Sequence, residues 1–215
     1  MDIAIIGTGN IGAGLVETLA KAGNRVIVAG KSAADGPELA AKVTASSRGE
    51  LRGATVAEAV QQAEIVILAV PYGAIDAIAR EAAFDGKIVV DLSNPVKEDF
   101  SGITLGFTTS AAEQVQALLP AAQVVKAFNT VFAQVYGEGL EFGARKVPTF
   151  IASDHDAAKA KVMEMAADAG FDPVDAGPLR NARYLEPLGY LNIQFGYMLG
   201  HGTQIVPAWL SREAA

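Results

Sequence analysis

The fold is decided by Gly7-Thr8-Gly9-Asn10-Ile11-Gly12, which follows an apolar run over residues 3–6 and precedes a helix-like segment over residues 13–19. A strand, a glycine turn and a helix form the context in which G-x-G-x-x-G indicates dinucleotide binding. Gly7 permits the tight turn, Gly9 lets a pyrophosphate approach the backbone, and Gly12 lets the helix lie close to the strand. The N–H groups around Asn10 and Ile11 would then face phosphate oxygens at the positive end of the helix dipole. The alternative is a glycine turn that serves packing alone.

The composition of the chain excludes several other classes of function. The chain has 215 residues and a net charge of −7, which argues against binding to nucleic acid or to anionic membranes. It contains no cysteine and two histidines, so disulfides, thiolate metal sites and a histidine-rich metal centre are excluded. The apolar run over residues 65–70 is too short to span a bilayer. We expect no signal peptide, because the first strand begins two residues after Met1 and leaves no room for one. We therefore expect a cytoplasmic protein.

The end of the second strand, over residues 25–29, indicates which dinucleotide binds. Enzymes that use NAD usually carry Asp or Glu there, about 20 residues after the glycines, to bind the ribose 2′-hydroxyl. This chain has Gly30, Lys31 and Ser32 instead. A lysine and a hydroxyl would bind a 2′-phosphate, which a carboxylate would repel. The stretch favours NADP(H) over NAD(H), although Asp35 lies nearby and Lys31 could be a solvated loop residue.

Apolar strands alternate with helical segments along the rest of the chain. The expected strands cover residues 53–55, 64–70, 87–92, 123–128, 147–152 and 171–175, and the expected helices cover residues 38–47, 56–62, 72–83, 110–120, 154–169 and 179–199. This order predicts an α/β fold with a Rossmann-type, doubly wound, mostly parallel sheet. We expect one domain over residues 1–215, with residues 147–215 as a short C-terminal α/β extension and residues 200–215 as a tail.

Ligands of such sheets lie at the carboxyl ends of the strands, near the point where the strand order reverses. Beyond the glycine turn and the loop over residues 30–32, that edge holds Val70, Pro71, Asn94 and Asn129. We expect these residues to bind the cofactor.

Three stretches together resemble the family of NADPH-dependent F420 reductases, the 8-hydroxy-5-deazaflavin:NADPH oxidoreductases. They are residues 5–12, the sequence Lys126-Ala127-Phe128-Asn129-Thr130, and residues 175–188. The stretches also resemble the reductase domain of STEAP metalloreductases. The resemblance covers nearly the whole chain, and residues 175–188 are its most particular part.

The resemblance implies a small Rossmann domain, often in a homodimer, and hydride transfer between nicotinamide and a deazaflavin or flavin ring. By position, Thr8 to Ile11 would hold the pyrophosphate, and Gly30 with Lys31 matches a Ser-Arg pair that binds the 2′-phosphate. Val70 and Pro71 would line the ribose and the ring, and Asn129 would face the nicotinamide. Some members that use F420 carry His-Thr where this chain has Asn129-Thr130, so F420, FAD and FMN all stay open as the second redox partner.

No single residue is predicted to be catalytic, because the two rings carry the chemistry of such a reaction. His201 could reach the site or lie in solvent, and Trp209 could stack on a flavin or serve as a core or interface residue. Asp91 could be a base, but we expect it to cap the turn that follows its strand. Arg183 and Glu186 are expected to pair on a helix surface, and the alternative is a partly buried contact in a dimer.

Two other functions stay open at this point. The chain could be a non-catalytic protein that senses NADP(H) and acts through a protein partner. It could also be a dehydrogenase of the β-hydroxyacid or pyrroline-carboxylate type, although these enzymes need a longer helical domain after the Rossmann unit.

Overall fold

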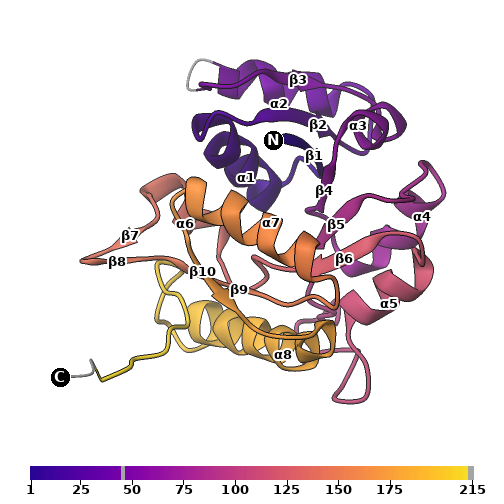
Figure 1. Cartoon of the computed structure of the whole chain (residues 1–215). Helices are drawn as coiled ribbons and strands as arrows, with labels where there is room; N and C mark the ends of the chain where they lie inside the picture. The colour runs from indigo at the N-terminus through magenta and orange to yellow at the C-terminus, as the bar shows by residue number, and fades with distance from the viewer. Residues whose placement is uncertain (45–46, 213–215) are drawn as a thin grey trace.

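A computed structural model of the chain describes residues 1–44 and 47–212. Its centre is a six-stranded sheet in the order β3-β2-β1-β4-β5-β6, and every neighbouring pair is parallel (Figure 1). The strands are β1 (Asp2–Ile6), β2 (Arg25–Ala29), β3 (Leu51–Gly53), β4 (Ile65–Leu68), β5 (Ile88–Asp91) and β6 (Gln123–Lys126). The strand order reverses between β1 and β4, where α/β sheets bind their ligands. The predicted Rossmann-type α/β fold is confirmed.

The register of the sheet brings the strand ends to one edge. Ile6 lies opposite both Ala29 and Leu68, and Asp91 lies between Leu68 and Lys126. The loops that follow β1, β2, β4, β5 and β6 therefore leave the sheet side by side, which is why residues distant in sequence can share one site.

Helices cover both faces of this sheet. They are α1 (Asn10–Lys21), α2 (Asp35–Val43), α3 (Val56–Gln62), α4 (Ile75–Ala79), α5 (Ala111–Leu118), α6 (Ala133–Glu138) and α7 (Asp156–Asp168). In β1, Ile3 and Ile5 pack with α1, α2, α6 and α7, whereas Ala4 and Ile6 pack with α3, α4 and α5. A strand that is covered on both faces must be apolar at successive positions, as β1, β2 and β4 are.

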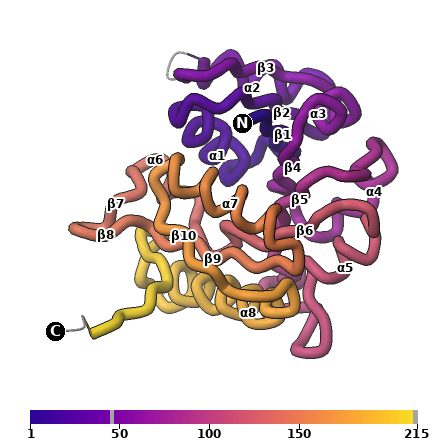
Figure 2. The backbone as a smooth tube through the Cα atoms, in the orientation of Figure 1, coloured from indigo at the N-terminus to yellow at the C-terminus, as the bar shows by residue number. Residues whose placement is uncertain are grey.

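The C-terminal part forms a second, smaller layer (Figure 2). Strands β9 (Pro148–Ile151) and β10 (Asp172–Asp175) pair in parallel, and a 3-10 turn (Leu179–Asn181), helix α8 (Ala182–Ile193) and a π-helical turn (Gln194–Met198) follow. Two backbone hydrogen bonds between Ala152 and Lys126 tie this layer to β6. Leu185 of α8 packs on Phe150 and Ala152. Residues 200–212 contain no regular secondary structure.

Several predicted boundaries are wrong. Helix α2 begins at Asp35 rather than at residue 38, because Pro37 fits a first turn, where its missing N–H is not needed. The predicted end of this helix covers residues 45–46, which lie outside the described residues. The third strand covers residues 51–53 instead of 53–55. The helix predicted over residues 72–83 is a 3-10 turn (Tyr72–Ala74) followed by α4, whose end is tightened by bonds from Arg80 to Ala77 and from Glu81 to Ile78.

The predicted connection over residues 138–146 contains more structure than expected. Helix α6 ends at Glu138, and a hairpin of β7 (Glu141–Phe142) and β8 (Arg145–Lys146) follows it. Helix α6 packs closely on α1, since a Cβ on Gly14 would lie 2.6 Å from the Cβ of Tyr136. In the described part of the chain, no helix is both long and apolar enough to cross a membrane.

Candidate active site

The glycine turn has the geometry that its three glycines predict. Gly7 has a φ of 124°, and a Cβ there would lie 2.2 Å from the carbonyl oxygen of Ala69. A Cβ on Gly12 would lie 2.0 Å from the carbonyl oxygen of Gly7. Gly9, in contrast, faces open space, with no atom within 4 Å of a built Cβ. Gly7 and Gly12 therefore serve close packing, and Gly9 leaves room for a ligand.

The N-terminus of α1 begins directly after this turn and lacks a protein cap. Gly9 is the N-cap residue, no side chain caps the helix, and its first turn carries no acidic residue. The first amides of any α-helix have no partner within the helix. In α1 these include the amides of Asn10, Ile11 and Gly12, at the end where the helix dipole favours an anion.

A cleft of about 440 Å³ opens beside this helix end. Its lining comes from the ends of β1, β4, β5 and β6 together with α8 and the π-helical turn. Among the predicted cofactor-binding residues, the cleft brings together Gly9, Asn10, Ile11, Val70, Pro71, Asn94 and Asn129. Gly7, Thr8, Gly12, Gly30, Lys31 and Ser32 lie outside its lining.

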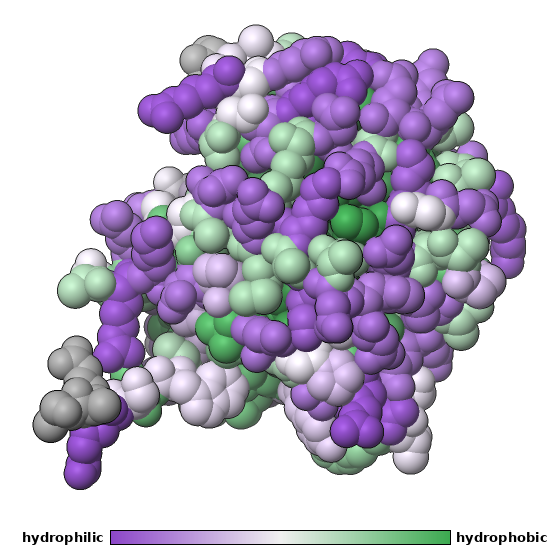
Figure 3. All heavy atoms as spheres, in the orientation of Figure 1, coloured by the Kyte–Doolittle hydropathy of each residue, from purple (hydrophilic) through white to green (hydrophobic). Residues whose placement is uncertain are grey.

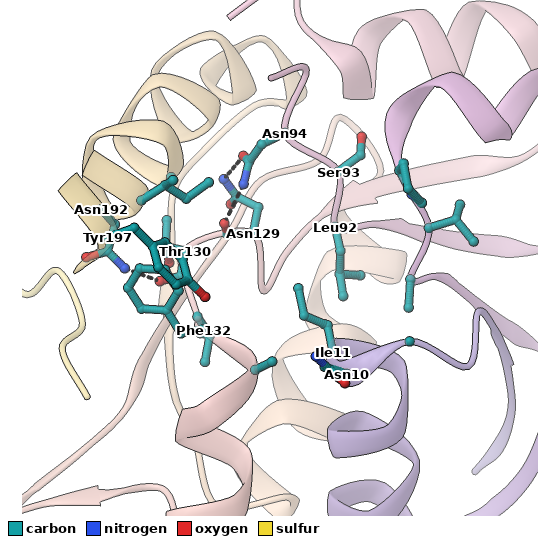
Figure 4. Close-up of a pocket in the computed structure, with 18 of the residues that line it drawn as sticks. Asn10, Ile11, Leu92, Ser93, Asn94, Asn129, Thr130, Phe132, Asn192 and Tyr197 are labelled. Atoms are coloured by element: carbon teal, nitrogen blue, oxygen red, sulfur yellow. Dashed lines mark hydrogen bonds between the residues drawn. The ribbon is translucent and has the colours of Figure 1, made fainter. Parts of the chain in front are cut away.

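The wall opposite α1 is a pair of asparagines (Figure 4). Asn94 Nδ2 donates to the carbonyl oxygen of Asn129 at 2.8 Å, and Asn129 Nδ2 donates to Asn94 Oδ1 at 2.9 Å. Asn129 Nδ2 also donates to the carbonyl oxygen of Leu185 on α8 at 2.8 Å. Helix α8 comes this close because position 189 is glycine: a Cβ there would lie 2.7 Å from Asn94 Oδ1.

The backbone at the end of β6 directs Asn129 into this wall. Phe128 has a φ of 58°, a left-handed conformation that is strained for a bulky residue. Its N–H donates to Thr149 Oγ1 at 3.1 Å, and its ring packs edge-on against Phe171. Such strain is typical of functional sites, where the surrounding structure maintains it.

Two polar atoms at the cleft have no partner among the described residues. Ser93 Oγ and Asn129 Oδ1 are buried, yet neither makes a hydrogen bond. Both residues line the cleft. Because buried polar atoms are nearly always paired, each unpaired atom needs an explanation, and a polar ligand is one. The uncapped helix, the open space at Gly9 and these two atoms fit a dinucleotide that spans the cleft.

A buried ionic cluster lies behind the asparagine wall, and sequence reasoning missed it. Lys126 Nζ lies 2.7 Å from Asp91 Oδ2 and 3.1 Å from Glu186 Oε1, and it also donates to the carbonyl oxygen of Ser93. Ser93 N donates to Asp91 Oδ1 at 3.0 Å. Lys126 and Asp91 are fully buried and Glu186 is 2% exposed. The cluster fixes the turn that carries Ser93 and Asn94.

Burial and the neighbouring charges both shift the pKa values of Glu186 and Lys126 in this cluster. Burial raises the pKa of Glu186, although the ammonium of Lys126 and the amides of Ala111 and Ala112 oppose that shift. Burial alone would lower the pKa of Lys126, but the carboxylates of Asp91 and Glu186 raise it above its usual range. Lys126 therefore stays charged. Asp91 caps the following turn, as expected, and its burial leaves no access for a base to act on a ligand.

The predicted pair of Arg183 and Glu186 is wrong. Arg183 instead donates through Nε and Nη2 to both carboxylate oxygens of Glu113 on α5, at 2.8 and 2.6 Å. Glu186 points inward and accepts from the first amides of α5. The spacing of three residues favours a surface pair only where both side chains face solvent, and the turn at the start of α8 buries Glu186.

The loop over residues 30–32 follows β2 beside the glycine turn, since Gly7 N donates to the carbonyl oxygen of Ala29 at 2.8 Å. Ser32 donates to the carboxylate of Asp35 both through its amide, at 2.9 Å, and through its hydroxyl, at 2.5 Å. The loop predicted to receive a 2′-phosphate is therefore partly engaged by a carboxylate.

Asn192 and Phe132 also line the cleft, and no local pattern in the sequence marked either of them. Asn192 Nδ2 donates to the carbonyl oxygen of Thr130 at 3.1 Å, and the ring of Tyr197 meets Phe132 edge-on with centroids 5.5 Å apart. His201 and Trp209 are both exposed and do not line the cleft; they contact the rings of Phe195 and Phe150.

A parallel sheet with this glycine turn and a cleft at its switch point defines a Rossmann-type dinucleotide-binding protein. Residues 2–95 match the family described as NADP oxidoreductase, coenzyme F420-dependent. The F420-dependent NADP reductase of Methanothermobacter marburgensis is 34% identical over 201 residues, which cover 87% of this chain and 89% of that relative. The chain belongs to the family of F420-dependent NADP reductases, which are oxidoreductases.

Two further similarities agree with this assignment. The metalloreductase STEAP3 of Rattus norvegicus is 34% identical over 190 residues, which cover 86% of this chain, and the chain spans only 36% of that relative's length. The crystal structure of a proposed F420-dependent NADP reductase from Arthrobacter sp. FB24 superposes with a TM-score of 0.79 at 27% identity, covering 95% of this chain and 96% of that one. The predicted resemblances to F420-dependent NADP reductases and to STEAP metalloreductases are both confirmed.

Proposed function

We propose that this NADP-dependent oxidoreductase transfers a hydride between the nicotinamide of NADP(H) and a flat acceptor ring, either F420 or a flavin such as FMN or FAD. The observation that carries the proposal is the cleft itself, which runs from the uncapped N-terminus of α1 to the Asn94–Asn129 wall. In a bound dinucleotide, the diphosphate would lie at the α1 end of this cleft and the nicotinamide ring at the asparagine end.

The chain's own residues have distinct parts in this proposal. The amides of Asn10 and Ile11 hold the diphosphate, and Gly9 keeps the approach open. Val70 and Pro71 line the ribose and the ring, while Asn94 and Asn129 fix the nicotinamide end. Gly7, Thr8 and Gly12 shape the turn, and Gly30, Lys31 and Ser32 face the adenosine 2′-phosphate.

The lining of the cleft suits hydride transfer. Within the described residues it includes no Asp, Glu, His, Lys or Arg. The bound nicotinamide supplies or receives the hydride, so the protein's task is to set distance and orientation and to exclude water. The apolar side chains of Ile11, Leu92 and Phe132 surround the space where water would otherwise compete (Figure 4).

Absorbance at the reduced nicotinamide band tests the proposal directly. NADPH is mixed with the purified chain and with F420, FMN or FAD in separate reactions. We expect loss of NADPH that depends on the chain and on at least one acceptor. NADPH that persists with every acceptor contradicts the reductase function. Tight NADPH binding without turnover would favour the alternative of a sensor that acts through a protein partner, which the same uncharged cleft would also permit.

We also propose that the chain forms a homodimer through the outer side of α8 and the π-helical turn. Large apolar side chains are exposed there at helical spacing: Tyr184, Leu191, Phe195, Met198 and Leu199. The face drawn in Figure 3 carries small hydrophobic areas among hydrophilic residues. Sedimentation velocity tests this, because Leu191→Glu should convert a dimer to a monomer, whereas a monomeric unaltered chain would contradict it.

The organisation of the chain and its location complete the proposal. The chain acts as one domain with residues 147–215 as an extension, supported by the hydrogen bonds of Ala152 to Lys126 and of Glu186 to α5. A single calorimetric unfolding transition is expected, and two separate transitions would contradict it. A cytoplasmic location is tested by cell fractionation.

A further inference from the structure

The loop after β2 carries an internal partner for its own hydrogen-bond donors. Ser32 donates from its amide to Asp35 Oδ2 at 2.9 Å and from its hydroxyl to Asp35 Oδ1 at 2.5 Å. Asp35 is the first residue of α2, and its own amide donates back to the carbonyl oxygen of Ser32 at 3.3 Å. Both polar groups of Ser32 that could bind a phosphate are thus engaged by one carboxylate.

This carboxylate lies where the adenosine end of a dinucleotide is expected. The loop leaves the sheet next to the glycine turn, because Gly7 N is bonded to the carbonyl oxygen of Ala29, the last residue of β2. Asp35 lies directly against Gly30: a Cβ on Gly30 would lie 2.4 Å from the Cβ of Asp35 and 2.8 Å from its Oδ2. In Rossmann folds the end of this strand selects between a ribose 2′-hydroxyl and a 2′-phosphate.

The charges around the loop work in opposite directions. The hydroxyl and then the amide of Ser32 lower the pKa of Asp35, and Lys31 adds to that effect, so Asp35 is ionised at neutral pH. The backbone amide of Lys31 also faces the carboxylate of Asp35, and its ammonium attracts that carboxylate without forming a close ion pair within the described parts of the chain, so the ammonium can still reach a phosphate. A phosphate monoester carries a charge of about −1.5 to −2 at pH 7, so Asp35 repels it while Lys31 attracts it.

We propose that Asp35 is the specificity-determining residue of this site. Its carboxylate competes with the cofactor's 2′-phosphate for the amide and hydroxyl of Ser32, so the chain discriminates only weakly between NADP(H) and NAD(H). NADP(H) gains from Lys31 but must displace Asp35 from Ser32. NAD(H) has no 2′-phosphate, so it leaves the Ser32–Asp35 bonds in place. This inference rests on the proposed function, in that it requires the cleft to bind a pyridine nucleotide.

Titration calorimetry with NADP⁺ and NAD⁺ measures this competition without any turnover. The variants are Asp35→Asn, which removes the charge and keeps the shape, and Asp35→Ala, which also releases Ser32. We expect both variants to bind NADP⁺ at least about ten-fold more tightly than the unaltered chain, since one charge pair near a protein surface has an interaction of that order. NAD⁺ affinity should stay unchanged or fall. Glu38→Gln is the matched control, because it removes a carboxylate from the same helical turn without touching Ser32.

Combination with Ser32→Ala separates competition from a general change in charge. In the unaltered chain Ser32→Ala should change NADP⁺ affinity little, because Asp35 already engages the hydroxyl. In the Asp35→Ala background it should remove part of the gain, which identifies Ser32 as a donor that Asp35 had blocked. The proposal is overturned if the Asp35 variants bind NADP⁺ equally or more weakly, because Asp35 would then orient Ser32 for the phosphate. A chain that binds neither nucleotide would overturn the proposed function and this inference together.

Discussion

On one side of the cleft the backbone makes the site, whereas on the other side side chains make it through hydrogen bonds to distant parts of the chain. The α1 side needs only three glycines within six residues and the amides that follow them. The opposite side needs Asn94, Asn129 and Leu185, which are 35 and 56 positions apart, and the buried cluster behind them. We call the α1 side the first wall and the asparagine side the second wall. The first wall is sensitive to an added Cβ, and the second wall is sensitive to the loss of a polar partner.

The largest effect should come from removing the cation of the buried cluster. Lys126→Met leaves the carboxylates of Asp91 and Glu186 without their shared partner, which typically costs about 3–5 kcal/mol for a buried ion pair. We expect denaturant unfolding to show a loss of this size. Lys161→Met, which removes the exposed partner of Glu64, is the control and should leave the unfolding midpoint unchanged. Equal midpoints for both variants would contradict a stabilising role of Lys126 in the cluster.

Two glycine substitutions should separate packing from ligand binding within the first wall. Gly12→Ala places a Cβ against the backbone of Gly7, so we expect a loss of about 1–3 kcal/mol in unfolding free energy together with loss of nucleotide binding. Gly9→Ala meets open space, so it should weaken NADP⁺ binding while leaving the thermal unfolding temperature unchanged. Calorimetry for binding and circular dichroism for unfolding make the comparison. Gly9→Ala with full affinity would mean that no ligand approaches the turn.

Gly189→Ala should act on the second wall alone. The added Cβ would lie within 2.9 Å of Asn94 Oδ1, Asn94 Nδ2 and the carbonyl oxygen of Asn129, which displaces the nicotinamide end. We expect kcat to fall roughly ten- to a hundred-fold, the order that a misplacement of about 1 Å produces, with a smaller change in NADP⁺ affinity. Gly137→Ala in α6 meets no neighbouring atom and should leave kcat unchanged. A fall in NADP⁺ affinity without a fall in kcat would contradict the assignment of Gly189 to the nicotinamide end of the cleft.

The smallest effect concerns pH. The hydrogen bonds from Arg183 and Ser110 hold the pKa of Glu113 below its usual range. A carboxyl group with a lowered pKa in the folded state stabilises the fold above its unfolded pKa of about 4.3, and that contribution is lost as the pH falls through the folded pKa. The difference in unfolding free energy between the unaltered chain and Glu113→Gln should therefore shrink as the pH falls from 7 to below about 4. A difference that is constant over that range would contradict the assigned role of Arg183.

The contrast between the walls also explains what sequence could predict. Gly7, Gly9 and Gly12 could be interpreted one by one, because each meets a local steric demand, and the strands are apolar at every position over residues 3–6, 26–29 and 65–68 because both faces are covered. Strand ends also predicted which residues share an edge, and Val70, Pro71, Asn94 and Asn129 do line one cleft. Their contact with a cofactor stays a prediction.

The second wall could not be predicted because its contacts are long-range. Lys126, Asp91 and Glu186 come from two neighbouring strands and one distant helix, and nothing in their local sequence states that all three are buried. Spacing along α8 favoured an Arg183–Glu186 pair, but packing against α5 gave Arg183 a different partner. Gly189 resembles any helical glycine until the position of Asn94 is known.

The central claim is that the first amides of α1 hold the cofactor's diphosphate. Backbone amide resonances followed by NMR during titration with NADP⁺ test it most directly. The account predicts that the largest shifts occur at Gly9, Asn10, Ile11 and Gly12, with further shifts at Asn94 and Asn129. Saturable binding of NADP⁺ that leaves the amides of α1 unchanged would contradict it.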